Sequence, residues 1–225
     1  MKVTLEPALA GRCRLGVVEA AGLRAPVARD EAPAWVAEVV GAAQAAGEAY
    51  WPNGIRRAVR DLLKQGRYRA TGRGKPASEF LMNAALGGEY PVVNDVVDAN
   101  NAVSLGCGYP ASVLDAALTG SELLLRRGEP GEAYVFNRAG HVIELEDLLL
   151  VCRRVGGRWE PCGNPVKDAM VTKVHEATTS VVAVVYQPAS LPGQRLQEAC
   201  ERFAHLLRTA CGARSATWRV VEAAK

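Results

Sequence analysis

The run VVAVVY, residues Val181–Tyr186, is a continuous block of apolar and mostly β-branched residues. Such a block, without polar alternation, predicts a strand that is buried on both faces in the middle of a sheet. A helical pattern over Gly193–Cys211 follows it, and Thr217–Val221 is predicted to be a final strand. The apolar stripe that this helix should bury consists of Leu196, Cys200, Phe203 and Leu207. The C-terminal part of the chain therefore predicts a buried strand with an amphipathic helix beside it.

Upstream of this run the chain shows both helical and strand-like patterns. Three helices are predicted, at Pro33–Tyr50, Asn53–Gly66 and Lys75–Gly87, with Asn53 as the N-cap and Gly66 at the end of the second one. The predicted strands are Arg12–Glu19, Glu122–Arg126, Ala133–Phe136, His141–Leu145 and Leu148–Val155. This mixture predicts an α+β fold. We expect a single domain over residues 1–225, with a candidate boundary near Gly72 between an N-terminal lobe, residues 1–72, and a core lobe, residues 73–225.

Composition narrows the class of protein. The chain has 225 residues, of which 49% are hydrophobic, and a net charge of +3, which is too small to make nucleic-acid binding the default. The six cysteines form no CxxC pair and only three histidines accompany them, so we expect reduced, buried thiols, no metal site and no cofactor. No stretch is long and apolar enough for a membrane span, and Met1–Leu15 is too charged for a signal peptide. The expected location is cytoplasmic, without a membrane partner.

Basic residues gather between Asn53 and Ala77, where Asp61 is the only acidic residue. On the predicted helix these cations lie roughly opposite the apolar stripe, and more of them follow in a loop that contains glycine. The candidate RNA-binding residues are Arg56, Arg57, Arg60, Lys64, Arg67, Arg73 and Lys75. A solvated helix face and a surface that binds phosphates are both compatible with this pattern.

The segment GEYPVVNDVVDANNAVSLGCGYPASVLD, residues Gly88–Asp115, places several amides and carboxylates in a short apolar frame. Such groups are costly to bury without partners, so they are expected to cap helices or to line a site. Asn94 and Asp95 are suited to capping the helix that follows them. Asn100 and Asn101 lie too far along that helix to be caps, so we assign them to a candidate site.

A second polar cluster lies in GNPVKDAMVTKVHEATT, residues Gly163–Thr179, between two strand-like regions. An exposed loop is the alternative interpretation of this segment. His175 and Glu176 are neighbours, and neighbours on a strand point to opposite faces, so they cannot enter one pocket unless the segment turns. We therefore favour Asp168, Lys173 and Glu176 over His175 as candidate catalytic residues.

Three motifs in order resemble a known family. The run YPVVNDVVDANNAVSLGCGYPASVLD, ending at Asp115, resembles a hallmark of the B-three/B-four domain, the tRNA-editing domain of the phenylalanyl-tRNA synthetase β-subunit. The run ELLLRRGEPGEAYVF, from Glu122, is similar to that family's following strands, and PVKDAMVTKV with Thr178-Thr179 looks like the freestanding members. The similarity covers roughly Arg67 to Pro188.

The resemblance implies a fold like that editing domain, with mixed sheets flanked by helices, and it implies roles for particular residues. Asn101 matches a pocket asparagine of the motif, and Ser112 stands where the synthetases commonly have a histidine. Ester hydrolysis can rest on an oriented water and on donors to the oxyanion, so the absence of the histidine leaves hydrolysis open. The candidate catalytic residues are thus Asn101, Ser112, Asp168, Lys173 and Glu176.

The function expected from these features is hydrolysis of a mischarged aminoacyl-tRNA in trans, with the amino-acid moiety in the pocket and the tRNA on the basic residues. Because the aminoacylation motifs and the length of a synthetase are missing, ATP-dependent charging of tRNA is not expected. Two alternatives remain: a non-catalytic module that binds an amino acid or an RNA end, and a small-molecule enzyme or sensor. The sequence leaves the amino acid, the tRNA and the oligomeric state open.

Overall fold

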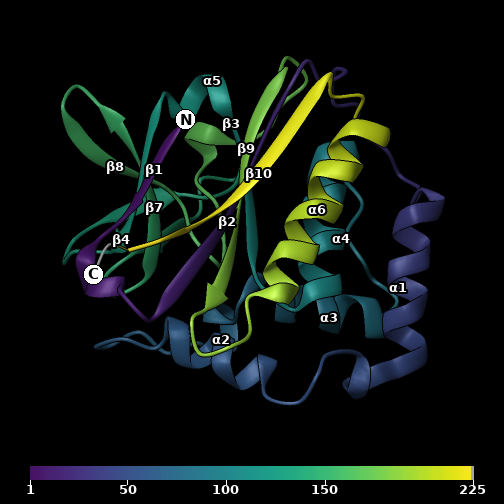
Figure 1. Cartoon of the computed structure of the whole chain (residues 1–225), viewed down its shortest axis with the longest axis horizontal. Helices are drawn as coiled ribbons and strands as arrows, with labels where there is room; N and C mark the ends of the chain where they lie inside the picture. Colours follow the sequence, from purple (N-terminus) through teal and green to yellow (C-terminus); the bar gives the residue numbers. More distant parts are fainter. Residues whose placement is uncertain (224–225) are drawn as a thin grey trace.

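The computed structural model describes residues 1–223 as three layers, in which a layer of helices and a second β-sheet cover the two faces of a central β-sheet (Figure 1). The predicted α+β class is confirmed, since the described residues hold six α-helices and three sheets. None of these helices combines the length and the apolar character that crossing a lipid bilayer requires.

The central sheet is antiparallel and places the VVAVVY run in its interior. Its strands, in spatial order, are β10 (Ser215–Glu222), β2 (Cys13–Ala21), β9 (Ser180–Pro188) and β3 (Ala111–Asp115). Val181–Tyr186 belongs to β9, which pairs with β2 on one side and β3 on the other, and every residue of the run is buried. The prediction of a strand covered on both faces is confirmed.

The second sheet is mixed and comes mostly from the middle of the chain. Its order is β1 (Lys2–Leu5), β4 (Glu122–Arg127), β7 (Leu149–Val155) and β8 (Arg158–Gly163), with β1 parallel to β4 and the other pairs antiparallel. The chain between β4 and β7 forms a separate two-stranded hairpin, β5 (Ala133–Val135) and β6 (Val142–Glu144). The predicted strands of this region are thus confirmed, whereas β1 was not predicted.

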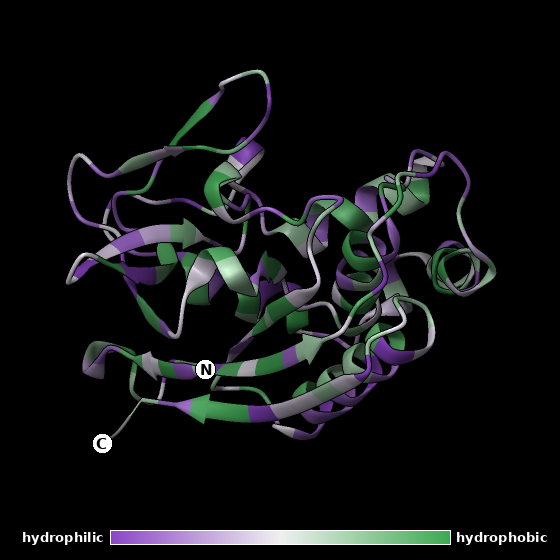
Figure 2. Ribbon diagram, turned by 90° about the horizontal axis from the view of Figure 1, so that it is seen from above, coloured by the Kyte–Doolittle hydropathy of each residue, from purple (hydrophilic) through white to green (hydrophobic). Residues whose placement is uncertain are grey.

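The helical layer consists of α1 (Ala34–Ala46), α3 (Ala77–Gly87), α4 (Asp95–Cys107) and α6 (Gln194–Thr209). They share one hydrophobic core with the side chains on the face of the central sheet that is turned toward the helices, including Val181, Ala183 and Val185 of β9. Gly16 of β2 allows α6 to approach closely, because a Cβ at this position would lie 2.3 Å from the Cys200 sulfur. In Figure 2, hydrophobic segments follow the inner strands and helices, and many outer loops are hydrophilic.

A second core lies between the two sheets, where Val182, Val184 and Tyr186 of β9 face residues of β4 and β7. Helix α2 (Ile55–Leu63) touches both cores, because Ile55 and Val59 belong to the helical side while the last two residues of the helix belong to the inter-sheet side. The remaining short elements are α5 (Ala116–Thr119) and the 3-10 turns Pro7–Leu9, Gly47–Tyr50, Gly72–Gly74 and Met170–Thr172.

Three local expectations differ from the structure. Helix α2 ends at Leu63, with Lys64 as its C-cap, rather than at Gly66. Asn53 is not the N-cap of α2, because the helix begins at Ile55 after Gly54, whose left-handed φ of 92° glycine tolerates readily, and no side chain caps it. The boundary near Gly72 does not separate two structural units. Strand β1 pairs with β4 and strand β2 pairs with β9 and β10, so residues before and after Gly72 build both sheets together.

The capping and thiol predictions are confirmed for Asn94 and for the cysteines. The Asn94 side chain accepts hydrogen bonds from the backbone N–H groups of Val96 and Val97 at 3.1 and 3.0 Å, which fixes the start of α4. All six cysteines are free thiols and buried. Within residues 1–223 no group of three or more His, Cys, Asp and Glu side chains is arranged to hold a metal ion.

Candidate functional site

A polar cluster interrupts the apolar core between the two sheets, and Ser112 is its centre. Along β3 the side chains alternate: Ala111 and Val113 enter the helical core, so Ser112 and Leu114 face the second sheet. The Ser112 hydroxyl is completely buried and donates to Asp168 Oδ1 at 2.6 Å. It also lies 3.0 Å from the Tyr186 hydroxyl, on the neighbouring strand β9.

Asp168 reaches this cluster from the segment that follows β8. Its Oδ1 accepts a second hydrogen bond from the backbone N–H of Asn164, at 3.1 Å. Gly163 makes room for the carboxyl group, because a Cβ there would lie 2.9 Å from Asp168 Oδ1. The residue is partly exposed, and Oδ2 accepts no hydrogen bond from residues 1–223. Hydrogen bonds therefore hold Oδ1 in place, whereas Oδ2 has no hydrogen bond within the described residues.

The charge state of Asp168 is unusual for an aspartate. Burial of the carboxyl group raises its pKa from 3.8 to about 7, against the opposing effects of the Ser112 hydroxyl, the Asn164 N–H and the Lys173 ammonium. At neutral pH both protonation states are therefore populated. A carboxyl group of this kind can accept and return a proton, which is the property that general acid–base catalysis requires.

Lys173 stands beside Asp168 and faces the β5–β6 hairpin. Its ammonium group donates to the Phe136 carbonyl at 2.6 Å, and partial burial lowers its pKa while the Asp168 carboxylate opposes that change. The Lys167 ammonium lies 4.1 Å from the centre of the Phe136 ring. Two cations of the segment after β8, Lys167 and Lys173, thus contact Phe136, which follows β5, and the charge of Lys173 acts on the Asp168 carboxyl group.

Asn164 and Tyr134 support this segment and were not identified from the sequence. The Asn164 side-chain oxygen Oδ1 accepts from the backbone N–H groups of Val166 and Lys167, both at 2.7 Å, in an Asx turn, and its side-chain Nδ2 donates to the Tyr134 hydroxyl. The Tyr134 hydroxyl donates to the Lys167 carbonyl at 2.7 Å. The Asn-Pro dipeptide at 164–165 was a sequence signal for this turn, whereas nothing local pointed to Tyr134.

The structure places the other predicted catalytic residues differently. Glu176 is exposed in a turn, and its carboxylate has no hydrogen bond or ion pair within residues 1–223. Asn101 lies on α4 and accepts from the Asn100 amide at 3.4 Å, and that amide also donates to the Ala111 carbonyl at 3.3 Å. Asn101 is thus linked through Asn100 to Ala111 of β3, the residue before Ser112, and forms no hydrogen bond with Asp168 within residues 1–223.

His175 serves the structure of its loop. Its Nε2 lies 3.4 Å from Asp115 Oδ2, and its Nδ1 accepts from the Ala177 N–H at 3.2 Å, so both ring nitrogens are occupied. Asp115 Oδ2 also accepts from the Thr178 hydroxyl at 2.6 Å. These contacts tie the loop to the end of β3, which agrees with the preference for Asp168 and Lys173 over His175.

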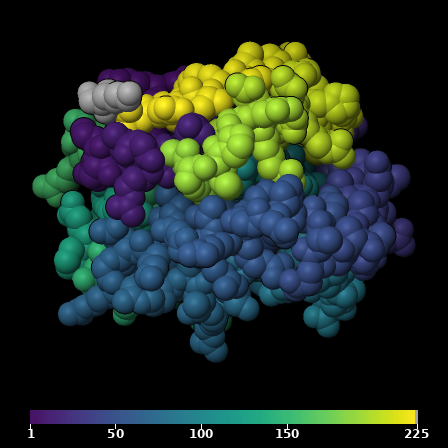
Figure 3. Space-filling view, turned by 60° about the horizontal axis from the view of Figure 1, so that its bottom comes forward, coloured from purple at the N-terminus to yellow at the C-terminus, as the bar shows by residue number. Residues whose placement is uncertain are grey.

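The segment that holds the predicted RNA-binding residues, residues 53–77, spreads over the face seen in Figure 3, where it is coloured blue, and is called the basic face below. Of these residues, Arg57, Lys64, Arg67 and Arg73 are exposed. Arg56 lies 3.4 Å from the exposed Glu48 carboxylate, and Lys75 is partly buried. Arg60 differs, because it is committed to a bidentate ion pair with the buried Glu79 carboxylate, at 2.5 and 2.6 Å.

The basic face and the Asp168 cluster are connected through the start of α3. The N–H of Ala77 donates to the Pro165 carbonyl at 2.8 Å. Pro165 precedes Asp168 by three positions, and Ala77 follows Lys75 by two, so this hydrogen bond joins the segment that holds Lys75 to the segment that holds Asp168.

Comparison of the chain with models of known protein families finds no match, and comparison with curated proteins also finds none. The geometry of the site is therefore the main guide to its chemistry.

Proposed function

We propose that the protein hydrolyses the ester bond of an aminoacyl-tRNA in trans, with Asp168 as the general base. The single observation that carries this proposal is a carboxyl group with a pKa of about 7 whose Oδ1 is held by Ser112 and whose Oδ2 accepts no hydrogen bond within residues 1–223. The resemblance of residues 67–188 to tRNA-editing domains supports the choice of substrate. The basic face next to the site supports an RNA partner.

The proposed reaction needs only a water as co-reactant. Asp168 Oδ2 takes a proton from the water as its oxygen attacks the ester carbonyl carbon, and the carbonyl π electrons move onto oxygen. The Lys173 ammonium stabilises that oxyanion. When the intermediate collapses, the C–O bond to the ribose breaks and the ribose oxygen takes the proton from Asp168. The products are a free amino acid and tRNA with a free terminal hydroxyl.

Ser112 is in this scheme a positioning residue. Its hydroxyl holds Asp168 Oδ1 and is itself in contact with the Tyr186 hydroxyl, so the carboxyl group is held in a set orientation. The serine therefore does not replace the histidine of the family as a base. The acid–base role passes to Asp168, which lies 56 residues away in the sequence.

The test is a deacylation panel in which tRNAs charged with different amino acids are incubated with the wild-type protein, the Asp168→Asn variant and the Glu176→Gln variant. We expect at least one substrate to be hydrolysed, with a rate constant that falls by about a hundredfold or more in Asp168→Asn, since a general base contributes about that much. Glu176→Gln is the matched control and should keep the rate. Because the unprotonated carboxylate is the base, the wild-type rate should rise with pH through about 7.

Two results would contradict the proposal. Turnover no faster than in buffer for every charged tRNA would exclude hydrolysis, and an unchanged rate in Asp168→Asn would exclude the base. If tRNA binds with a strong salt dependence but the aminoacyl ester is not hydrolysed, the protein is a binding module without catalysis. Charge reversal at Arg57 and Lys64 without any change in tRNA affinity would instead favour a small-molecule enzyme or sensor.

A further inference from the structure

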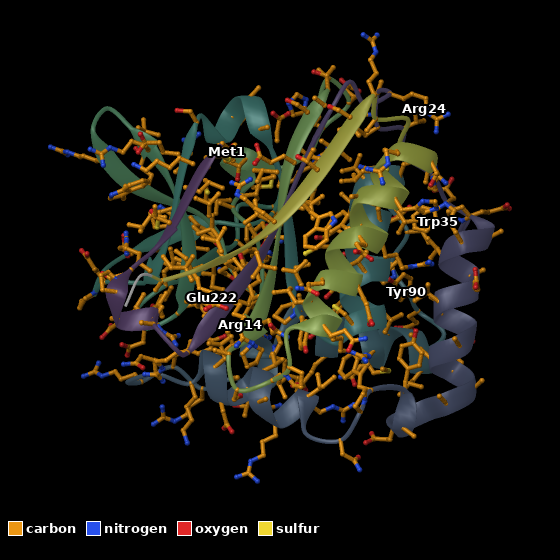
Figure 4. All side chains as sticks on the ribbon, viewed as in Figure 1. Met1, Arg14, Arg24, Trp35, Tyr90 and Glu222 are labelled. Carbon is orange, nitrogen blue, oxygen red and sulfur yellow. The ribbon has the colours of Figure 1, made fainter. Side chains whose placement is uncertain are left out.

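A cleft of ≈ 960 Å³ opens between α1 and α6, away from the Asp168 cluster. Its lining comes from α1, from α6, from the first residue of α4, and from the loop that connects β2 to α1. Figure 4 shows two of the lining residues, Arg24 and Trp35, around the upper ends of these helices. The volume lies within the range of small-molecule sites, roughly 300–1,000 Å³. None of the residues assigned to hydrolysis or to the basic face lines it.

Several basic side chains that line this cleft have few partners within residues 1–223. Arg202 and His205 are exposed and lie one turn apart on α6, and their side chains form no hydrogen bond or ion pair within residues 1–223. The Arg24 side chain is 68% exposed; it donates to the Ala210 carbonyl and lies 4.0 Å from the nearest Asp95 oxygen. Two guanidinium groups and an imidazole are therefore available to an anion that enters from solvent.

Arg29, by contrast, lines the cleft and forms ion pairs with two carboxylates. It donates to Asp95 Oδ1, and its Nε lies 3.9 Å from Oδ2 of the fully buried Asp98. Both Arg29 Nε and Asp98 Oδ2 are buried without a hydrogen-bond partner. The charge of Arg29 is thus largely offset inside the protein by Asp95 and Asp98.

An aromatic face and a carboxylate complete the lining. Trp35 is only partly buried although it is large and apolar, and Val27 in the connecting loop is 66% exposed. Both line the cleft, so part of its surface is apolar, and an indole can pack against a planar ring. Glu38 follows Trp35 by one helical turn, is exposed, and has no ion pair within the described residues. The Glu38 carboxylate would repel a simple anion, whereas it can accept a hydrogen bond from a ribose hydroxyl or from a base amine.

We propose that this cleft binds a nucleotide, with the base stacked on Trp35, the phosphate on Arg24 and Arg202, and a base amine or ribose hydroxyl donating to Glu38. Arginine suits phosphate because its planar fork donates two parallel hydrogen bonds. Indole suits a base because stacking on an aromatic side chain contributes about 1–3 kcal/mol. The nucleotide has two sources with the same chemistry: a free mononucleotide or one residue of an RNA strand.

The experiment titrates the full-length protein with AMP, GMP, CMP and UMP, with a single-stranded oligoadenylate, and with inorganic phosphate, and follows binding by calorimetry. We expect at least one nucleotide or the oligonucleotide to bind. Trp35→Ala and Arg202→Glu should each weaken binding about tenfold or more. Trp35→Tyr should restore most of the affinity because it keeps an aromatic face. Thermal unfolding of each variant checks that the fold is intact.

The matched control is Arg208→Glu, which changes the charge of the same helix by the same amount outside the cleft. It should bind as the wild type does, and so should Asp168→Asn, because the cleft does not depend on the proposed hydrolysis. Because an oligonucleotide can also bind the basic face, the comparison uses the part of the binding that Trp35→Ala removes: if this part is tighter for the oligonucleotide than for AMP, an RNA strand is the source, and the reverse identifies a free nucleotide. The proposal is overturned if no nucleotide binds, if inorganic phosphate binds as tightly as the nucleotides, or if Trp35→Ala binds unchanged.

Discussion

At the scale of the residue, Asp168 shows how a buried carboxyl group acquires a near-neutral pKa. Two donors, the Ser112 hydroxyl and the Asn164 N–H, stabilise the carboxylate, yet loss of hydration outweighs them and raises the pKa to about 7. The unfolded chain should titrate this group near 3.8. The folded protein therefore binds one more proton than the unfolded chain between these two pH values.

This difference makes stability depend on pH. Because the folded state holds the extra proton, the contribution of Asp168 to stability is present below pH 4 and is lost as pH rises to about 7. Asp168→Asn keeps an oxygen that can accept from Ser112 but cannot ionise. The variant should therefore gain stability over the wild type by about 2–4 kcal/mol at pH 8 and much less at pH 4.

Urea unfolding of both proteins at the two pH values measures this effect. If the variant were instead less stable than the wild type at pH 8, the fold would stabilise the ionised carboxylate rather than destabilise it through lost hydration. This result would also remove the physical basis for Asp168 as a base near neutral pH.

At the scale of the element, α2 carries two kinds of arginine that the helical wheel could not separate. Arg57 is 89% exposed and lies 3.7 Å from Asp61 on its own helix. Arg60 joins α2 to α3 through Glu79, whose side chain is 5% exposed. The first is a solvated cation, and the second holds two helices together.

Alanine substitution should separate the two roles. Arg60→Ala leaves the buried Glu79 carboxylate without its partner and should lower the free energy of unfolding by about 2–3 kcal/mol. Arg57→Ala, the matched control, should change it by less than about 0.5 kcal/mol, because exposed ion pairs contribute little. Urea denaturation of the two variants measures both values. Equal losses would show that the Arg60–Glu79 pair is dispensable.

At the scale of the whole molecule, the first residues of the chain are built into both sheets. Strand β2 lies between β9 and β10 in the central sheet, and β1 forms an edge of the second sheet next to β4. Side chains of β1 and β2 also belong to the core between the sheets, beside Leu125 and Val184. Residues before Gly72 thus form part of the core between the two sheets, together with residues from the rest of the chain.

A fragment of residues 73–225 should therefore fail to fold. Without β2, strands β9 and β10 lose their shared neighbour and expose backbone donors and acceptors together with apolar side chains. Circular dichroism and a denaturant titration of the fragment should show no cooperative transition. A cooperative transition would mean instead that the two parts are independent lobes, as the boundary near Gly72 in the sequence allowed.

Much of the fold and part of the site could be predicted from residue patterns. The VVAVVY strand, the stripe of α6 and the Asn94 cap depend on neighbours within a few positions, so the sequence displays them directly. Strand β1 was missed because four residues at an edge carry little periodicity. Among the expected site residues, Ser112 donates to Asp168 and the Lys173 charge acts on Asp168, whereas Glu176 faces solvent.

The order of patterns along the chain was sufficient for the α+β class, for the central position of β9 and for the location of the polar segments, because periodicity records which faces are buried. The partner of each polar group depended on the packing of segments far apart in the sequence. Ser112 meets Asp168 and Arg60 meets Glu79 only because strands and helices bring them together, and the pKa of Asp168 follows from the hydration that is lost there. No local pattern encodes that loss, since it depends on every layer that covers the carboxyl group.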